Sequence, residues 1–256
     1  MSRHLRAEHC GKILSIILDR PAQKNSLSIE LLSQLSGALC EQVTDATAAV
    51  IVSGANGCFS AGADFADLTG TVEDLAVDDA IAGAVRAIQQ VPVPVVAAVD
   101  GPCIGAAVDL CLACDLRAAS RSAYFQIPAT RLGLLYNPAA VARLARVTLP
   151  DTLFRLLVLG ERLSAEEALR AGLLSYELSD GASLEAVMVR IQASSENIPR
   201  AVAASKSLLY SLNAGEYDPD HWHEVRKQIL SSPERRAAVE RMKKKQAGTN
   251  REGGTR

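Results

Sequence analysis

The sequence predicts an α/β fold organised around a largely parallel sheet. Strand and helix patterns alternate over the first two-thirds of the chain, which is typical of strands joined by helical crossovers. One stretch near the middle, residues 93–99, is a Val-rich apolar run bounded by Pro and by Asp100-Gly101, as expected for a strand covered on both faces. Of the 256 residues, 48% are apolar and only 4% aromatic, so the chain can bury a large aliphatic core.

The first elements are indicated by alternation and by a capping residue. Residues 4–19 contain two strand-like runs joined at Cys10-Gly11, which is typical of a hairpin. Ser28 can accept a hydrogen bond from the first free amides of a helix, so a long amphipathic helix is expected from there to about Val43. The apolar run 48–53 is the next expected strand.

The middle of the chain carries the elements around which the rest is organised. A helix over 79–90 leads into the strand 93–99, and the small-residue turn Gly105-Ala106-Ala107 opens a helix that carries Asp109. The extended pieces expected after it are 116–119, 123–127 and a last strand at 173–178. From Pro138 onward helical patterns dominate, separated by Gly and Pro turns.

Composition argues against several classes of protein. The net charge of −2 gives no nucleic-acid footprint, and no apolar run approaches a membrane span, so we expect a cytoplasmic protein without nucleic-acid or membrane partners. Cys111 and Cys114 lie in an apolar helical run, which favours buried packing over a zinc or redox site. The four histidines lie near the chain ends, which argues against a His-based triad, and we expect no metal.

Two loops rich in small residues indicate where chemistry can take place. Ser60-Ala61-Gly62-Ala63 follows one expected strand, and Gly105-Ala106-Ala107 follows the central one. If these strands are neighbours, the backbone amides of Ala63 and Ala106 can point into one cavity. Two such donors form an oxyanion hole, which stabilises a developing negative charge by ~3–4 kcal/mol per donor. The alternative is that each loop is only a tight turn.

The ordered motifs resemble the enoyl-CoA hydratase/isomerase family, the crotonases. The resemblance covers about residues 5–245 and is carried by LDRPAQKNSLS, CFSAGADFADL, PVPVVAAVDGPCIGAAVDLCLACDLRAAS, AYFQIPATRLGLL and LGERLSAEEALRAGLL. It implies a β-β-α spiral core over 1–196 and a helical C-terminal trimerisation region over 197–245, in homotrimers or dimers of trimers. The polar, Gly-rich composition of 246–256 predicts a disordered tail.

The resemblance also implies an acyl-CoA thioester substrate, a place in fatty acid metabolism, and no cofactor apart from the CoA of the substrate. The thioester oxygen would be held by the amides of Ala63 and Ala106. The positions expected to contact the CoA, pantetheine or acyl groups are Ala22, Lys24, Ser26, Ala61, Asp64, Phe65, Ala129 and Asn137. Lys24 is assigned to the CoA phosphates, with a solvated surface lysine as the alternative.

The acids decide which reaction is expected. Hydratases of the family use two glutamates, and the matching positions here are Asp109 and Ala129. Asp at the first position resembles the dienoyl-CoA isomerase subgroup, but the other two acids of that subgroup fall on Ala129 and Asn137. Because 116–150 contains no Asp or Glu, two-carboxylate hydration is doubtful. Asp109 alone can move a proton between carbons 2 and 4 of an enolate; otherwise its charge only stabilises the helix N-terminus.

Tyr136 also bears on which reaction is expected. It aligns with a tyrosine of the methylmalonyl-CoA decarboxylase branch of the family, which tends to carry a His where this chain has Ala63. A phenol there can orient a substrate carboxylate or the thioester, or only line the acyl pocket. Three hypotheses stay open: a hydratase/isomerase-family enzyme with Asp109 as its acid/base, a malonyl-type CoA decarboxylase with Tyr136 near the carboxylate, and a non-catalytic acyl-CoA carrier.

Overall fold

The structure, a computed structural model, describes residues 4–179, 183–192 and 196–252. The chain divides into two compact units, Met1–Ser195 and Glu196–Arg256, and each is described by itself. Within the described ranges, no helix combines the length and the apolar character that a membrane crossing requires.

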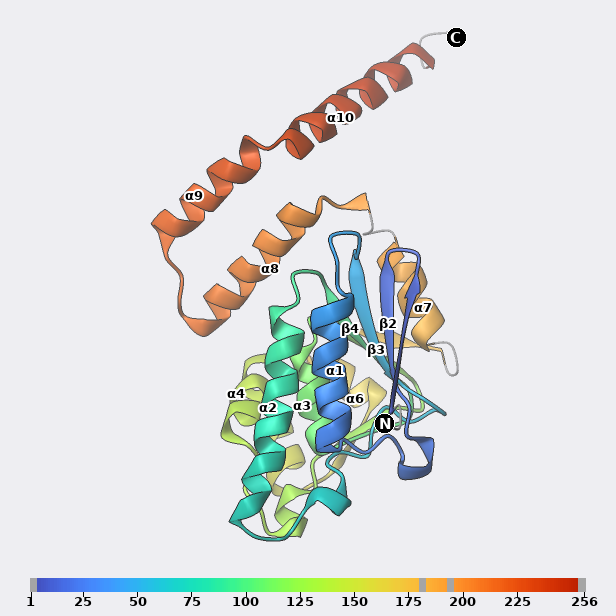
Figure 1. The fold of residues 1–256 in the computed structure, drawn as a ribbon, viewed down its shortest axis with the longest axis vertical. Coiled ribbons are helices and arrows are strands. Elements are labelled where there is room, and N and C mark those ends of the chain that lie inside the picture. Colours follow the sequence, from blue (N-terminus) through green and yellow to red (C-terminus); the bar gives the residue numbers. More distant parts are fainter. Residues whose placement is uncertain (1–3, 180–182, 193–195, 253–256) are drawn as a thin grey trace. The chain divides into compact units, whose positions relative to one another are not determined.

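The first unit is built on a six-stranded sheet in the order β1-β2-β3-β4-β6-β9 (Figure 1). Its strands are β1 Leu5–Cys10, β2 Ile13–Leu18, β3 Ala49–Gly54, β4 Val95–Val99, β6 Leu116–Ser120 and β9 Tyr176–Leu178. The pair β1 and β2 is an antiparallel hairpin, and all other neighbours in this sheet run parallel. The predicted α/β class and largely parallel sheet are confirmed.

A second sheet contains three short strands. It consists of β5 Pro102–Ile104, β7 Tyr124–Gln126 and β8 Arg162–Ser164, with β5 parallel and β8 antiparallel to β7. The sequence predicted an extended piece only at β7. Strand β7 lies within the longer run 123–127 that the sequence indicated, whereas the three residues of β5 or β8 show no alternating pattern by themselves.

Helices cover both faces of the large sheet. On one face lie α1 Ile29–Gln42 and α2 Leu75–Gln90, and on the other lies α7 Ser183–Gln192 (Figure 1). Side chains of β4 alternate accordingly: Val95 and Ala97 join the main core, whereas Val96 and Ala98 pack with Val187 of α7. The other α-helices that the structure describes in this unit are α3 Ala106–Ala113, α4 Pro138–Val147, α5 Pro150–Leu153 and α6 Ala165–Arg170.

The starts of α1 and α2 compare differently with their predicted positions. Ser28 caps α1 as predicted, because its Oγ accepts a hydrogen bond from the Leu31 amide at 3.2 Å. Helix α2 begins at Leu75 rather than at the predicted residue 79. The Asp74 side chain closes the preceding turn by accepting hydrogen bonds from the amides of Thr69 and Gly70 at 2.7 and 3.0 Å. The segment before α2 is polar, and the first turn of α2 ends on Asp78, so its apolar residues Leu75 and Val77 were grouped with the preceding loop.

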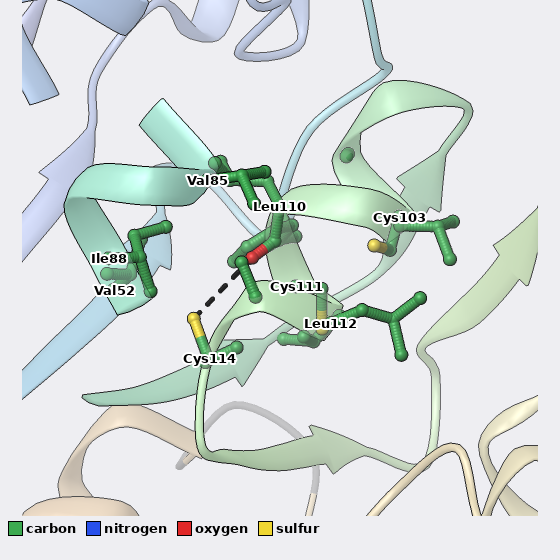
Figure 2. Close-up of a cluster of buried hydrophobic side chains, with 14 of the residues drawn as sticks. Val52, Val85, Ile88, Cys103, Leu110, Cys111, Leu112 and Cys114 are labelled. Atoms are coloured by element: carbon green, nitrogen blue, oxygen red, sulfur yellow. Dashed lines mark hydrogen bonds between the residues drawn. The ribbon is translucent and has the colours of Figure 1, made fainter. Parts of the chain in front are cut away.

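Helix α3 lies inside the main core and is buried along almost its whole length. Figure 2 shows Leu110, Cys111 and Cys114 of this region together with Val85 and Ile88 of α2. The Cys114 thiol donates to the Leu110 carbonyl at 3.6 Å, one turn earlier. The prediction that Cys111 and Cys114 are buried packing residues is confirmed, and α3 is a firmly packed support for the residues at its start.

The second unit is helical, as predicted for the C-terminal part. It contains α8 Pro199–Ala214, α9 Pro219–Leu230 and α10 Pro233–Glu252. The expected disordered tail begins at residue 246, whereas α10 continues as helix to Glu252. The Lys and Arg residues up to Lys244 are good helix formers, and a helix that has begun propagates readily through such residues. The last four residues of the expected tail lie outside the described ranges.

Candidate active site

The two loops of small residues, 60–63 and 105–107, are in contact. Strands β3 and β4 are parallel neighbours, so the segments that follow them leave the same edge of the sheet. A Cβ built on Gly62 would stand 2.6 Å from the carbonyl oxygen of Ile104 and 3.5 Å from the amide nitrogen of Ala106. Gly62 also has φ of +93°, which disfavours any side chain. The backbone of the first loop therefore packs directly against the turn before α3.

Hydrogen bonds fix the first loop on both sides. The Leu27 amide donates to Gly62 O at 2.8 Å and the Asp64 amide donates to Leu27 O at 3.2 Å. On the opposite side, Ser60 exchanges hydrogen bonds with strand β5: its amide donates to Pro102 O at 3.1 Å and its carbonyl accepts from the Ile104 amide at 3.0 Å. In the parallel bridge between Leu27 and Ala63, the bonds to Leu27 come from residues 62 and 64. The amide of Ala63 consequently points away from Leu27.

Two backbone amides remain available at this junction. Ala106 is the first residue of α3, where helical amides lack an intrahelical acceptor. Within the ranges that the structure describes, neither the Ala63 nor the Ala106 amide donates a hydrogen bond to another residue. Their loops are in contact through Gly62, so the arrangement can present two donors to one ligand oxygen.

Asp109 lies beside these donors and is paired. Its side chain is buried on the first turn of α3. The guanidinium of Arg143, from α4, binds both carboxylate oxygens: Nε donates to Oδ1 at 2.8 Å and Nη2 donates to Oδ2 at 2.7 Å. The side chain of Arg143 is 19% exposed. The bidentate, charge-assisted geometry compensates for the burial of both charges.

Tyr136 also reaches α3 from the segment before α4. Its hydroxyl donates to the carbonyl oxygen of Gly105 at 2.9 Å. Burial raises the pKa of Tyr136 well above its usual value, and the charges of Asp109 and Cys103 act in the same direction. The phenol therefore stays protonated at neutral pH and remains a hydrogen-bond donor.

A second carboxylate approaches from α2. Burial raises the pKa of Asp78; the nearby charges of Asp79 and Asp109 add to this, while the Asn137 side chain opposes it. Asn137 caps α4, because its Oδ1 accepts from the amides of residues 139 and 140 at 2.9 and 3.3 Å. Asp78 is thus a neighbour of the Asp109 region that comes from a different helix.

Asp64, on the other loop, is held by several partners. Its Oδ2 binds Arg20 Nη1 at 2.6 Å, and its Oδ1 accepts from the Ala66 amide at 3.1 Å. Burial by itself would raise the pKa of Asp64, but the hydrogen bonds from Ala66, Arg20 and Ser26 outweigh it and lower the pKa below its ordinary value. This carboxylate fixes the loop around Ala63.

The other predicted substrate contacts fall into two groups. Ala22 and Lys24 are exposed, and Lys24 O accepts from the Ala61 amide at 2.9 Å, which places this loop beside the first small-residue loop. Phe65 is 69% exposed, an unusual position for a large apolar side chain. By contrast, Ser26 is buried and accepts from Arg20, while Ala129 is buried. These two have little surface to offer a ligand.

Sequence reasoning assigned no role to Arg143, Arg20 or Asp78. Arg143 is one of five arginines in 116–150, a stretch that contains no acid, so any of these guanidinium groups that becomes buried needs a carboxylate from elsewhere in the chain. No comparable signal marks Arg20, because its partner lies 44 residues away. Across the described ranges, no group of three or more His, Cys, Asp or Glu side chains is placed to hold a metal ion.

Comparison with known proteins identifies the family. A sequence model described as enoyl-CoA hydratase/isomerase matches residues 8–241. The chain belongs to the enoyl-CoA hydratase/isomerase family. This crotonase is 31% identical to a probable enoyl-CoA hydratase of Mycobacterium tuberculosis, over 70% of this chain and 73% of that protein. It is 33% identical to the mitochondrial Δ(3,5)-Δ(2,4)-dienoyl-CoA isomerase of Mus musculus, over 78% of this chain and 66% of that one.

The fold of this crotonase agrees with the family. A solved enoyl-CoA hydratase/isomerase family protein of Hyphomonas neptunium superposes with a TM-score of 0.90 and 26% identity, covering 95% of each chain. The predicted crotonase-like core with a helical C-terminal part is therefore confirmed. As a member of this family, the protein is expected to act on acyl-CoA thioesters.

Proposed function

We propose that this protein holds the thioester oxygen of an acyl-CoA between the amides of Ala63 and Ala106. The observation that carries the proposal is the packing of Gly62 against the backbone of residues 104–106, which brings the two loops together. An enolate oxygen bound there would gain ~3–4 kcal/mol from each donor. The N-terminus of α3 adds its partial positive charge at the same point.

The proposed reaction is a proton shift along the acyl chain of an unsaturated thioester. The Asp109 carboxylate accepts a proton from carbon 2 of a 3-enoyl ester, and the C–H electron pair moves into a dienolate whose charge rests on the thioester oxygen. The same proton then returns at carbon 4, which gives the conjugated 2-enoyl ester. One acid/base and no water suffice, which suits a chain that has Ala129 in place of the second hydratase acid.

A non-catalytic acyl-CoA carrier is the second candidate, and one contact favours it. Arg143 binds both oxygens of Asp109 and so stabilises the negative charge that a base gives up when it takes a proton. If this pair stays closed when the thioester binds, the ester is held without turnover. A malonyl-type decarboxylase has less support, because the Tyr136 hydroxyl donates its single proton to Gly105 O and has none for a substrate carboxylate.

The CoA portion of the substrate is proposed to lie along the loop that contains Lys24. Lys24 is assigned to the CoA phosphates and Phe65 to the pantetheine, because both side chains are exposed beside the Ala61 loop. Asn137 is assigned to the acyl end, whereas the burial of Ala129 speaks against a direct contact with the substrate. The helical residues 197–245 are proposed to join copies into a trimer or dimer of trimers, which sedimentation velocity would test.

A panel of matched CoA esters tests the function. The 2-enoyl, 3-enoyl and 3,5-dienoyl esters of C6 and C10 chains would be assayed for isomerisation and hydration by absorbance and product analysis, with calorimetry on the saturated esters. Isomerisation of 3-enoyl or dienoyl esters is expected. Tight binding without turnover of any ester would select the carrier, and failure to bind any CoA ester would contradict both candidates.

A further inference from the structure

We infer that Tyr136 is a positioning residue that aims the Ala106 amide by holding the carbonyl of Gly105. The inference rests on the proposed function, because it concerns one of the two amides assigned to the thioester oxygen. It gives Tyr136 a task that requires no contact with the substrate.

The key observation is that both groups belong to one peptide unit. The Gly105 carbonyl and the Ala106 amide share a planar peptide bond, and the bond is trans, as are all peptide bonds in the described chain. In a trans peptide the C=O and N–H point in opposite directions. The 2.9 Å hydrogen bond from Tyr136 Oη to Gly105 O therefore fixes the direction in which the Ala106 N–H points.

In two other helices of the protein, the carbonyl of the residue before the helix accepts a hydrogen bond from the amide four residues later. In α1 the Ser28 carbonyl accepts from the amide four residues later, Leu32, at 2.9 Å; in α4 the Asn137 carbonyl accepts from Val141 at 3.0 Å. In α3 the corresponding carbonyl, Gly105 O, accepts instead from the Val108 amide at 3.0 Å and from the Tyr136 hydroxyl. A side chain from another segment, Tyr136, thus takes part in the first turn of α3 through its carbonyl end.

Gly105 leaves the peptide that follows it with little local restraint, so a hydrogen bond from another segment can fix its orientation. Gly105 has φ of +57° and ψ of −125°, and it has no side chain to restrict rotation of the following peptide. The side chains of Ser28 and Asn137 cap the starts of their helices, but Gly105 has no side chain that could cap α3. The Tyr136 hydroxyl supplies the missing restraint on the peptide.

The same hydrogen bond strengthens the amide as a donor. A donor on the carbonyl polarises the peptide, and the hydrogen bonds of a chain strengthen one another by about 10–30% per bond. Because burial keeps the phenol protonated, the effect persists over the physiological pH range. When a thioester oxygen is bound, Tyr136, the Gly105-Ala106 peptide and the ligand would form one continuous chain of donors and acceptors.

The test uses the full-length protein, Tyr136→Phe, and Tyr176→Phe as a matched control. Tyr176 lies half-buried on β9, where it contacts Arg190 and packs with the small apolar cluster around Val187, whereas the residues of α3 belong to the main core. The probe is an aromatic 2-enoyl-CoA whose absorption moves to longer wavelength when its thioester carbonyl is polarised. In Tyr136→Phe we expect a smaller red shift of the bound probe. The turnover rate of the 3-enoyl ester should be about five- to tenfold lower, with binding of that ester nearly unchanged. Tyr176→Phe should match the wild type.

Two further readouts separate positioning from general loss of structure. Selective ¹⁵N-alanine labelling reports the Ala106 amide, whose proton shift should move upfield in Tyr136→Phe while the other alanines stay in place. Site-specific 3-fluorotyrosine at position 136 is a stronger donor and should increase the red shift. A full red shift and rate in Tyr136→Phe would overturn the inference alone, whereas no red shift in the wild type would overturn the proposed oxyanion site as well.

Discussion

Two aspartate–arginine pairs lie next to the two amides, and they are held in different ways. Asp64 binds Arg20 and is also tied to the backbone by the Ala66 amide. Asp109 is bound through both oxygens by the guanidinium of Arg143. The first pair joins loop segments close to the surface turn that follows Ala63, while the second joins two helices, α3 and α4.

The difference indicates which carboxylate is free to do chemistry. The charge of Asp64 is shared among a backbone amide, a hydroxyl and a guanidinium, so displacing any one of them leaves the others in place. Among the side-chain contacts of the described residues, the Asp109 carboxylate has a single cationic partner, Arg143. A pair with one partner can be rearranged by a substrate, whereas a carboxylate with several backbone and side-chain partners serves mainly to fix the loop.

Removing Arg143 should have the largest effect on stability. In Arg143→Met the buried Asp109 carboxylate loses its counter-charge, and we expect the free energy of unfolding to fall by about 3–5 kcal/mol. Urea denaturation of the variant measures this. The double variant Arg143→Met/Asp109→Leu removes both charges and should recover most of the loss. Equal stabilities for the two variants would show that the charge pair is not the cause.

Asp109→Asn should have the largest effect on turnover. The amide cannot accept the substrate proton, so the rate on the best ester should fall by about 10²–10³-fold with little change in KM. Asp64→Asn is the matched control, because it makes the same change beside the other amide, and its rate should fall by less than about tenfold. A full rate in Asp109→Asn would exclude Asp109 as the acid/base.

Asp64 should instead appear in the pH dependence of stability. Its pKa in the folded protein is lower than in the unfolded chain, so its contribution is present above about pH 4 and is lost as the pH falls through the folded pKa. At pH 7, Asp64→Asn is expected to be about 2 kcal/mol less stable than the wild type. Thermal melts between pH 2 and 7 measure the difference, which should shrink toward pH 2. A difference that is independent of pH would mean that packing, not charge, is lost.

Lys24→Ala should give the smallest effect. If Lys24 faces the CoA phosphates from its exposed turn, KM rises a few-fold, kcat is unchanged and the difference disappears at high salt. Lys227→Ala, which removes an exposed lysine from the second unit, provides the control for net charge. Identical KM values for the two variants would assign Lys24 to the solvated surface.

The sequence predicted those parts of the fold that depend on neighbouring residues. The Val-rich strand β4, the Ser28 cap and the buried Cys111 each follow from a local pattern, and the structure contains all three. The contact between the loops that carry Ala63 and Ala106 was also predictable, because both loops end strands of one parallel sheet.

The electrostatic partners were not predictable, because they depend on tertiary packing. Asp109 and Arg143 are 34 residues apart, and only the packing of α3 against α4 brings them together. The link from Tyr136 to Gly105 has the same character, since no pattern in the sequence shows that a phenol enters the first turn of another helix. Asp78 was missed because the start of α2 was placed four residues too late.

The burial of α3 ties the working of the site to the integrity of the whole first unit. Surface loops can open locally while the rest of a protein persists, but amides in a core helix are released mainly when the entire unit unfolds. Helix α3 is enclosed along nearly its full length, so the end that carries Ala106 and Asp109 cannot fray separately. On heating, activity should therefore disappear together with the fold and not through a gradual loosening of the site.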